Sequence, residues 1–420
     1  MNRFIHYIAI IFLSLASTYA YAEEQTTISC INVSADTIIF NDADWSPLFD
    51  RLQMLCDSVS TEREVVSIVH LGDSHIQAGH FTEALRVPAQ QKWGNAGRGL
   101  IIPLKLTKTN EPRDYSITSP DKWSHNRCLG KQFSQEVGVG GISIQPISKY
   151  IDLTISTTSC NGEDERFCSL RLLHSTSDKF PQLLPTPDLD SMQVDYKQGE
   201  THYQWSPSVA TNTIQLQGAN SYEAHDAAIY GALLENGKNG VLIHSIGNNS
   251  ATYECYNKVY QYGTKLAVLQ PHLVIISMGT NESVSSTIKP EHLYNQIDQL
   301  ISSIKKDSPD ALILLTTPAD NKLRKRKRRN KKRVVYYAHN PHITTVVETI
   351  KQYGKENNIA VWDWFTISGG ENTSDTWVKE QGMAKDHIHY TQTGYSIQGN
   401  LLFESIYNAY EQHIRQHRSI

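Results

Sequence analysis

A serine follows directly on an apolar run that is typical of a buried strand. Residues 65–71 read Val-Val-Ser-Ile-Val-His-Leu, and Gly72, Asp73 and Ser74 come next. Apolar runs of this length are typical of strands in a parallel sheet, and open α/β sheets bind ligands beyond the carboxyl ends of their strands. Ser74 is therefore either part of an ordinary turn or a nucleophile, and residues elsewhere in the chain decide between the two.

Two later groups of polar residues also follow strand-like runs. Gly279 and Asn281 come after the apolar run 273–278, where an asparagine amide can donate to a developing oxyanion. Asp386 and His389 lie three residues apart in a loop before an expected carboxyl-terminal helix. A serine hydroxyl is a poor nucleophile by itself, so a histidine has to take its proton while an aspartate holds the other ring nitrogen. The pattern predicts a Ser–His–Asp triad.

The three groups together resemble the sequence blocks of SGNH hydrolases, the GDSL family. Residues 72–74 read Gly-Asp-Ser and are similar to the first block. Residues 279–282 read Gly-Thr-Asn-Glu, where the third block of the family is Gly-x-Asn-Asp. Residues 386–389 read Asp-His-Ile-His and match the fifth block, Asp-x-x-His. The blocks occur in the family's order, and each follows an expected strand.

The resemblance implies a role for each of these residues. It makes Ser74 the nucleophile, His389 the general base and Asp386 the residue that orients the base. It makes Asn281 a donor in the oxyanion hole, on the turn that Gly279 begins. This chemistry requires neither a cofactor nor a metal, and the sequence contains no metal-binding spacing such as His-Glu-x-x-His.

The second block is where the chain departs from the family. The family usually places a glycine there, whose backbone N–H joins the oxyanion hole. Residues 245–252 read Ser-Ile-Gly-Asn-Asn-Ser-Ala-Thr. An alignment on the Ala-Thr pair puts the donor at Ser250, whereas an alignment on glycine puts it at Gly247, and both stay open. Glu282 replaces the usual aspartate of the third block, and we expect a structural role for it.

The runs around these groups predict an α/β fold. Five apolar runs are separated by stretches of helical periodicity, such as 291–306 and 345–356. Parallel strands joined by crossover helices predict a flavodoxin-like doubly wound sheet, which the family resemblance also implies. The expected strands are 65–71, 241–244, 273–278, 311–316 and 359–362.

The middle of the chain differs from the rest in composition and in its pattern of apolar residues. Residues 107–235 are rich in Ser, Thr, Gln and Asn and contain short alternating runs, which are typical of half-buried strands. We expect an antiparallel β-sandwich inserted into the α/β domain, whose two parts then span 23–106 and 236–420. Trp123 and Trp205 in the insert either stack on sugar rings or lie in its core.

The chain also resembles a narrower group, the bacterial peptidoglycan O-acetylesterases. The resemblance lies in residues 72–75, 81–85 and 93–97 and in the tail 388–395. It implies that the insert is similar to a carbohydrate-binding module. It also implies a serine esterase that removes O-acetyl groups from a glycan, above all from cell-wall peptidoglycan. The alternatives are an esterase for another acetylated polysaccharide or a lipid, an acetyl transferase, and a glycan-binding protein without turnover.

The amino terminus has the layout of a secretory signal peptide. Arg3 is followed by the apolar residues 8–16 and by Ala-Tyr-Ala at 20–22, which predicts a signal peptide over 1–22. The apolar core is shorter than the roughly 20 residues of a spanning helix, which disfavours a membrane anchor. We therefore expect an exported bacterial protein, in the periplasm or cell envelope or secreted, with no transmembrane segment after signal removal.

A dense run of Lys and Arg stands out in a chain whose net charge is only −4. It spans 322–333, is densest over Arg324–Arg333, and follows the fourth expected strand at the edge that carries the candidate site. A run of like charges repels itself, so we expect a mobile loop. Export argues against a nucleic-acid partner. The remaining interpretations are attraction to an anionic envelope polymer or membrane surface, and a solvated loop without a partner.

The cysteines are too sparse for a disulfide scaffold, and no Cys-x-x-Cys pair indicates a metal site. Export permits disulfides, so Cys160 could join Cys168, and Cys30 could join Cys56. Buried free thiols are the alternative. The six cysteines are Cys30, Cys56, Cys128, Cys160, Cys168 and Cys255.

Overall fold

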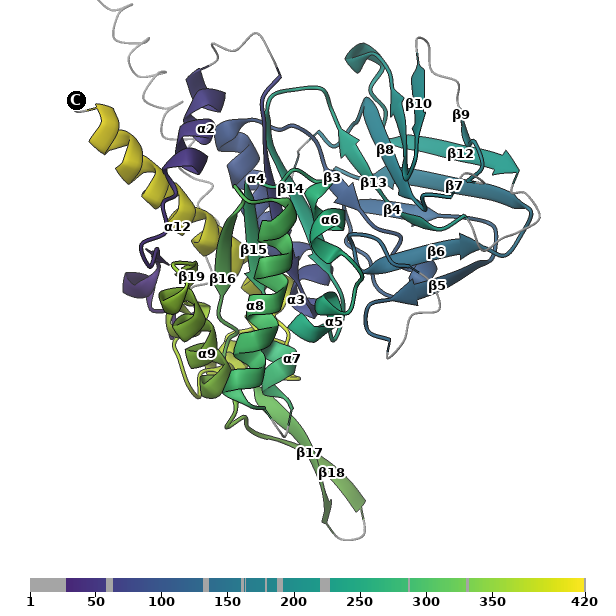
Figure 1. Cartoon of the computed structure of the whole chain (residues 1–420). Helices are drawn as coiled ribbons and strands as arrows, with labels where there is room; N and C mark the ends of the chain where they lie inside the picture. Colours follow the sequence, from purple (N-terminus) through teal and green to yellow (C-terminus); the bar gives the residue numbers. More distant parts are fainter. Residues whose placement is uncertain are drawn as a thin grey trace, which may run out of the picture.

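The protein consists of an α/β body, a β-rich unit beside it and a two-stranded hairpin that projects from the body (Figure 1). The computed structural model describes residues 28–57, 63–130, 136–159, 162, 164–177, 180–186, 192–219, 227–285, 288–329 and 332–418. The expected signal peptide 1–22 and Cys160 lie outside the described residues.

The α/β body is built on a mixed sheet. Its strands are β1 (Ile38–Ile39), β2 (Val65–Gly72), β14 (Gly240–Gly247), β15 (Leu273–Ser277), β16 (Leu312–Thr316) and β19 (Ala360–Trp362). They lie in the order β1-β19-β16-β15-β2-β14, and all neighbours except β1 and β19 run parallel. The parallel strands thus have the 2-1-3-4-5 order of flavodoxin-like sheets, which confirms the predicted doubly wound fold. Strand β1 escaped prediction because two residues carry no periodicity.

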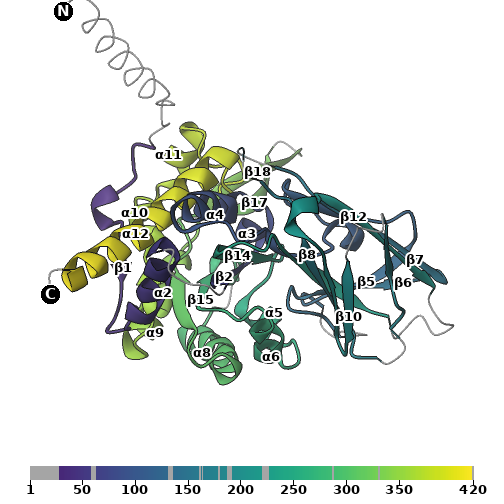
Figure 2. The ribbon, with the colours of Figure 1, turned by 90° about the horizontal axis from the view of Figure 1, so that it is seen from above.

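Two separate groups of helices cover the faces of this sheet, as Figure 2 shows from above. Successive side chains of a strand point to opposite faces. In β2, Val69 and Leu71 therefore pack with one apolar cluster, whereas Val66 and Ile68 pack with the other. The first cluster contains residues of α5 (Tyr253–Asn257), α6 (Tyr262–Ala267), α8 (Pro290–Asp307) and α9 (Ile343–Glu356). The second contains residues of α2 (Ser46–Asp57), α4 (His80–Trp93), α10 (Trp364–Ile367), α11 (Ser374–Lys379) and α12 (Gln392–Arg418).

The inserted unit consists of two antiparallel sheets. The larger contains β3 (Gly99–Ile101), β5 (Trp123–Arg127), β6 (Ile142–Pro146), β8 (Ser169–His174), β10 (Gln193–Lys197), β11 (Glu200–Gln204) and β13 (Ile229–Glu235). The smaller contains β4 (Tyr115–Thr118), β7 (Tyr150–Thr157), β9 (Leu184–Thr186) and β12 (Thr213–Ala219). Leu153 of β7 and Leu170 of β8 belong to the same core, as the two layers of a sandwich require. The expected antiparallel insert is therefore confirmed as part of the fold.

The exact limits of the insert stay a prediction, since β3 lies upstream of residue 107 and pairs with β13.

The two tryptophans of the insert are both buried. Trp123 is 8% exposed and Trp205 is 3% exposed. Both side chains therefore lie in the core, and neither offers a face on which a sugar ring could stack.

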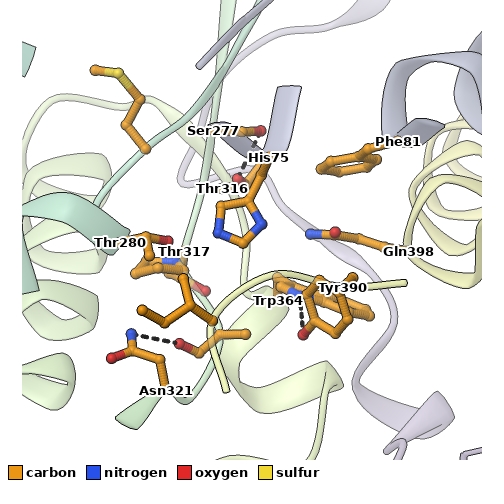
Figure 3. A pocket seen from close by; sticks show the side chains of 14 residues that line it. His75, Phe81, Ser277, Thr280, Thr316, Thr317, Asn321, Trp364, Tyr390 and Gln398 are labelled. Carbon is orange, nitrogen blue, oxygen red and sulfur yellow. Dashed lines mark hydrogen bonds between the residues drawn. The ribbon is translucent and has the colours of Figure 1, made fainter. Parts of the chain in front are cut away.

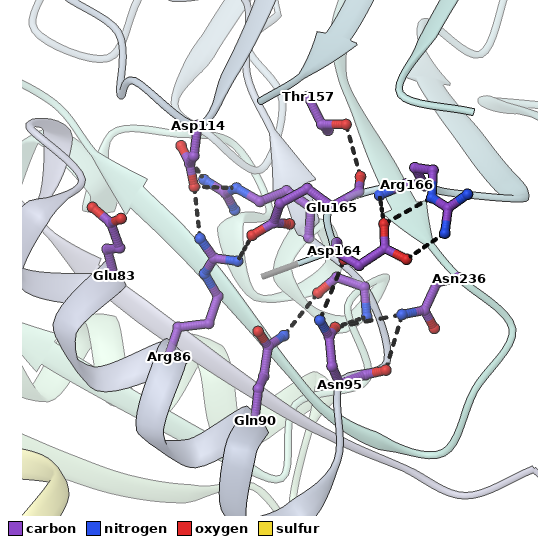
Figure 4. Close-up of polar contacts among 12 residues, drawn as sticks. Glu83, Arg86, Gln90, Asn95, Asp114, Thr157, Asp164, Glu165, Arg166 and Asn236 are labelled. Atoms are coloured by element: carbon purple, nitrogen blue, oxygen red, sulfur yellow. Dashed lines mark hydrogen bonds and ion pairs between the residues drawn. The ribbon is translucent and has the colours of Figure 1, made fainter. Parts of the chain in front are cut away.

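A buried ion-pair network fastens the insert to helix α4 (Figure 4). The guanidinium of Arg86 lies 2.8 Å from the Asp114 carboxylate and 2.6 Å from the Glu165 carboxylate, and Arg86 is 2% exposed. Arg98 contacts the same oxygen of Asp114 at 2.6 Å. Charges are costly to bury unless they are paired with good geometry. Because these charges are paired only when α4 and the insert are in contact, the network fixes the insert on the body.

Replacing Glu165 with alanine should lower the free energy of unfolding by about 3–5 kcal/mol, because the charge of Arg86 then stays buried with one partner fewer. The neighbouring Asp164 is a matched control, since its pair with Arg166 is exposed. Its alanine variant should lose only about 0–1 kcal/mol. Urea denaturation followed by circular dichroism measures both values. Equal losses in the two variants would contradict the role that we assign to the network.

The basic run forms a β-hairpin, so the expectation of a mobile loop was wrong. Strand β17 (Lys322–Arg329) pairs antiparallel with β18 (Lys332–His339). The residues after the run, Val334, Val335 and Tyr336, are strong strand formers and supply the partner strand. Arg326 lies opposite Val335, and Lys327 lies 5.0 Å from the ring centre of Tyr336. Cross-strand pairing thus places apolar residues opposite part of the run, whereas near the turn Arg328 lies opposite Arg333 and Arg329 opposite Lys332.

The expected bridge between Cys30 and Cys56 was also wrong, because both are free cysteines. Cys30 instead contacts the backbone oxygen of Ser368, and Cys56 lies against the Tyr410 hydroxyl. Cys168 is a free, buried cysteine, and its suggested partner Cys160 is outside the described residues.

Candidate active site

Ser74 lies at the carboxyl edge of the parallel sheet, as its place after β2 predicts. It is the first residue of helix α3 (Ser74–Gln77). Asp73 caps this helix, since its carboxylate accepts the N–H of His75 at 3.0 Å. Gly72 permits the sharp turn, because a Cβ there would lie 2.6 Å from the backbone oxygen of Ser277 and would overlap Ile76. The Gly-Asp-Ser sequence thus presents a serine at the start of a helix.

The structure brings Ser74, His389 and Asp386 into one hydrogen-bonded chain. Oγ of Ser74 lies 2.9 Å from Nε2 of His389, and Nδ1 of His389 lies 2.7 Å from Oδ2 of Asp386. The other oxygen of Asp386 accepts the backbone N–H groups of Ile388 and His389, each at 3.0 Å. The carboxylate is therefore held by its own loop, and it holds the imidazole against the serine.

The hydrogen bonds of the triad shift the pKa values of Asp386 and His389 in opposite directions. The bonds from His389 and from two backbone N–H groups hold the pKa of Asp386 well below its usual range. The hydrogen bond from Asp386 raises the pKa of His389 above its ordinary value of 6.5. His389 must lose its proton before it can accept one from Ser74. Activity that depends on this histidine should therefore rise with pH through a pKa above 6.5.

The two neighbouring histidines have other surroundings. The Nδ1 atom of His75 lies 3.0 Å from the Tyr395 hydroxyl, and burial lowers the pKa of His75 to about 3. Such a group is a poor proton acceptor. His387 packs against Tyr337 of the hairpin and contacts Asp375. His75 therefore serves hydrogen bonding and packing, and His387 serves packing and contact with Asp375.

Asn281 reaches the serine loop from helix α7 (Thr280–Ser283). Its amide Nδ2 donates to Asp73 at 3.1 Å and to the backbone oxygen of Ala251 at 2.9 Å. Both amide hydrogens have acceptors, so donation to an oxyanion requires exchange of one of these bonds. Gly279 precedes this helix with φ 117°, a left-handed conformation that favours glycine. It aims Asn281 at the site.

Two buried carboxyl groups support this arrangement. Asp73 is fully buried, and burial raises the pKa of its carboxyl to about 7. Glu282, the unusual residue of the third block, accepts the backbone N–H of Tyr253 at 2.8 Å. It thereby holds the start of α5, in keeping with the structural role expected for it. The link from Asp73 to Asn281 spans 208 residues and left no signal in the sequence.

Gly247 and Ser250, the two candidates for the second oxyanion donor, occupy different environments. Gly247 ends strand β14 and is buried, and a Cβ on it would overlap the backbone of Gln77 in α3. Ser250 is exposed in the loop after the strand and has φ 67°. Glycine is favoured at positions whose backbone adopts this left-handed conformation. Ser250 therefore has a backbone conformation that glycine adopts readily, whereas Gly247 serves the packing of α3.

Replacing Ser250 with glycine should leave kcat within about threefold, because the backbone N–H is kept, and should stabilise the fold by about 1 kcal/mol. Replacing Gly247 with alanine should instead lower activity more than tenfold, because the added methyl group displaces α3. Steady-state kinetics and thermal unfolding measure both effects. A large loss of activity in Ser250→Gly would mean that the serine hydroxyl itself is used.

Sequence reasoning missed a polar network one turn after the nucleophile. Oε1 of Gln77 accepts the backbone N–H of Asn249 at 2.7 Å, and the Gln77 amide donates to Thr109 and Asn110. Gln77 is 1% exposed. Only the short spacing from Ser74 could have drawn attention to it. The network ties helix α3 to the loop after β14 and to the start of the insert.

A small cavity lies beneath the catalytic loop (Figure 3). Its volume is about 30 Å³, and His75, Phe81, Ile388 and Tyr390 are among its lining residues. Cavities of this size accommodate water, but they are far too small for a sugar ring. The side chain of His389, by contrast, is 42% exposed.

Within the described ranges, no group of three or more His, Cys, Asp or Glu side chains is arranged to hold a metal ion. Among the helices of the same ranges, none is long and apolar enough to cross a membrane.

Comparisons with known proteins identify the family of the chain and similar folds. A family model described as GDSL-like lipase/acylhydrolase matches residues 68–402. A solved structure of a peptidoglycan O-acetylesterase superposes with a TM-score of 0.72 at 20% identity and covers 89% of this chain and 99% of its own. A lipase/acylhydrolase from Enterococcus faecalis has a TM-score of 0.31 at 18% identity, with 40% and 77% covered. No curated protein matches the chain.

Proposed function

The chain belongs to the GDSL-like lipase/acylhydrolase family and is a serine esterase, and we propose that it removes O-acetyl groups from cell-wall peptidoglycan through Ser74, His389 and Asp386. The observation that carries the proposal is the continuous hydrogen-bonded chain from the Asp386 carboxylate to the Ser74 hydroxyl. It supplies a nucleophile, a base and an orienting carboxylate at hydrogen-bonding distance.

In the first half of the proposed reaction, the acetyl group moves to the enzyme. Oγ of Ser74 attacks the acetyl carbonyl carbon while Nε2 of His389 takes the hydroxyl proton. The tetrahedral oxyanion receives hydrogen bonds from Asn281 and from the backbone N–H groups of Ser74 and Ser250. As the intermediate collapses, the C–O bond to the sugar breaks, and His389 gives its proton to the departing sugar oxygen.

In the second half, water removes the acetyl group. His389 takes a proton from a water molecule, whose oxygen attacks the acetyl-serine carbonyl. Acetate leaves, and the oxygen of Ser74 regains the proton from His389. Asp386 keeps the imidazole in the tautomer that both halves need and stabilises the imidazolium that forms in each.

The choice of peptidoglycan rests on the overall likeness to the peptidoglycan O-acetylesterase, which includes the inserted β-rich unit as well as the α/β body. The exposed triad is also suited to a polymer, because a glycan chain can cross an open surface without entering a cavity. An enzyme with this substrate works outside the cytoplasm, so we propose that the protein is exported to the periplasm or cell envelope.

Acetate release by the purified protein tests the proposal directly. O-acetylated peptidoglycan, acetylated xylan and an acetylated lipid are the substrates, and the Ser74→Ala variant corrects for spontaneous hydrolysis. Release from peptidoglycan supports the proposal. Release only from xylan or only from the lipid keeps the chemistry and overturns the substrate. Transfer of the acetyl group to an added sugar in place of free acetate would identify a transferase, and binding without turnover would identify a glycan-binding protein.

We further propose that the β17–β18 hairpin attracts an anionic polymer of the envelope. Its first strand exposes five consecutive cationic side chains, Arg324 to Arg328, and no acidic residue occurs in 322–339. Such a surface concentrates polyanions by long-range attraction. Cosedimentation with isolated cell walls should fall with added salt, and should fall at low salt when Arg324, Arg326 and Arg328 are replaced with serine. Cosedimentation that falls neither with added salt nor with the three substitutions would contradict this role.

A further inference from the structure

Arg127, at the edge of the candidate site, is a half-buried cation with no carboxylate partner among the residues that the structure describes. It ends strand β5 of the insert, and its terminal nitrogen donates to Oε1 of Gln77 at a long 3.5 Å. Its Nε atom is buried and has no hydrogen-bond partner within the described part of the chain. Besides burial, the groups that influence the pKa of Arg127 are Cys128 and Tyr256 rather than an Asp or Glu. A buried donor without a partner is costly, so its persistence calls for an explanation.

The position of Arg127 relative to the nucleophile is fixed by Gln77. Gln77 lies one helical turn after Ser74 in α3. The oxygen of Gln77 that receives the Arg127 contact also accepts the N–H of Asn249, which precedes Ser250 in the oxyanion loop. One side chain therefore connects the guanidinium both to the nucleophile helix and to the loop that borders the reacting carbonyl.

One further basic residue, His125, lies near Arg127, and Lys108 lies near His125. The pKa of His125, on the same strand, is lowered by burial and by the cations of Lys108 and Arg127. Lys108 is exposed and stands just before Thr109, which belongs to the Gln77 network. The three side chains thus form a basic cluster, Lys108, His125 and Arg127, on the insert side of the site.

Contacts between the insert and the α/β body hold the basic cluster in a fixed position. The amide of Asn248 donates to the backbone oxygen of Gly140 at 2.8 Å, which joins the oxyanion loop to the segment beside β5. The buried pairs of Arg86 with Asp114 and Glu165 fasten the insert to α4. A binding group that is held by such supports keeps its position relative to the reacting atoms.

We propose that Arg127, assisted by Lys108 and His125, binds a carboxylate of the glycan substrate and so selects anionic over neutral acetylated glycans. A guanidinium is suited to this task because its planar fork matches the two oxygens of a carboxylate. Peptidoglycan carries carboxylates on its peptides and on unsubstituted muramic acid, whereas unbranched acetylated xylan carries none. The inference rests on the proposed function, since it concerns the substrate of the same site.

The first test compares substrates in the wild type, Arg127→Met and Arg127→Lys. The measured quantity is the ratio of kcat/KM for O-acetylated peptidoglycan fragments to kcat/KM for acetylated xylo-oligosaccharides without uronic acid. A hydrogen bond to a charged group corresponds to about a 10- to 100-fold change, and we expect Arg127→Met to lower the ratio by that factor through KM. Arg127→Lys should restore part of it. An unchanged ratio would overturn the proposal.

The second test needs no turnover. Binding of O-acetylated peptidoglycan fragments is measured in the Ser74→Ala background, before and after their carboxylates are converted to methylamides. With Arg127 in place, we expect the protein to bind the unmodified fragments about 10-fold or more tightly than the methylamidated fragments. The Arg127→Met substitution should remove this preference. Arg166→Ala, whose guanidinium forms an exposed pair with Asp164, is the matched control. Failure of the wild type to release acetate would reject the proposed function alone, whereas indifference to methylamidation would reject this inference alone.

Discussion

Replacing Ser74 with alanine is expected to lower kcat for acetyl-ester hydrolysis by about 10⁴-fold or more, while KM changes little. The reason is that the hydroxyl of Ser74 is the group aligned with His389, at 2.9 Å. Without it, no covalent acetyl intermediate can form, and only the residual effects of the oxyanion donors remain. The measurement is the initial rate with a chromogenic acetyl ester, together with the mass of the intact protein after treatment with a sulfonyl fluoride. The wild type should gain one adduct and the variant none.

Ser245→Ala is a suitable control for this experiment. Ser245 lies on the neighbouring strand β14, near the same edge of the sheet, and its hydroxyl donates only weakly to the backbone oxygen of Ile76 at 3.4 Å. Its loss should therefore change kcat by about threefold or less. Hydrolysis that survives in Ser74→Ala at more than a tenth of the wild-type rate would mean that another group is the nucleophile.

The parts of the site that could be predicted from the sequence are those that local pattern determines. Ser74 and Asn281 each follow an apolar strand, and parallel strands bring their carboxyl ends to one edge of the sheet. Asp386 and His389 are close in sequence, so their mutual contact needed only a loop. The approach of His389 to Ser74 was implied by the family resemblance and not by the strand pattern, since α10 and α11 lie between β19 and His389.

The parts that could not be predicted depend on contacts between distant side chains. The carboxylate of Asp73 accepts a hydrogen bond from Asn281, on a different loop, and the Gly-Asp-Ser motif gave no indication of this contact. The choice between Gly247 and Ser250 depended on a backbone angle, since an alignment can place either residue at the same position. No sequence pattern indicated Arg127, because its place beside the candidate site results from packing of the insert against α3.

The errors at the fold level have a similar origin. The run Arg324–Arg333 was considered alone, and charge repulsion within it predicted a mobile loop. The following residues, including Val335 and Tyr336, form the second strand of a hairpin and place the cations on its surface. In the insert, Trp123 and Trp205 were compatible both with a sugar-stacking surface and with a core, and their burial places them in the core. Long-range pairing decided each case.

Replacing Asp386 with asparagine is expected to lower kcat/KM by about 10⁴-fold, although the shape of the site is kept. An amide can donate a hydrogen bond to Nδ1 of His389. The proton of the imidazole then moves to Nε2, the atom that has to accept from Ser74. Such a variant holds the histidine in the wrong tautomer, and it also loses the negative charge that stabilises the imidazolium during the reaction.

The pH dependence distinguishes this explanation from simple misfolding. Hydrogen bonding to Asp386 raises the pKa of His389 above 6.5, so the activity of the wild type should be lost as pH falls through that raised pKa. In Asp386→Asn the carboxylate that raises the pKa is gone, and the acid limb of the residual kcat/KM profile should move to lower pH. Asp375→Asn is the matched control, because Asp375 contacts His387 in the same loop without touching His389. It should keep both the rate and the profile. An Asp386→Asn variant that loses less than tenfold, or whose acid limb stays in place, would show that His389 acts without the help of Asp386.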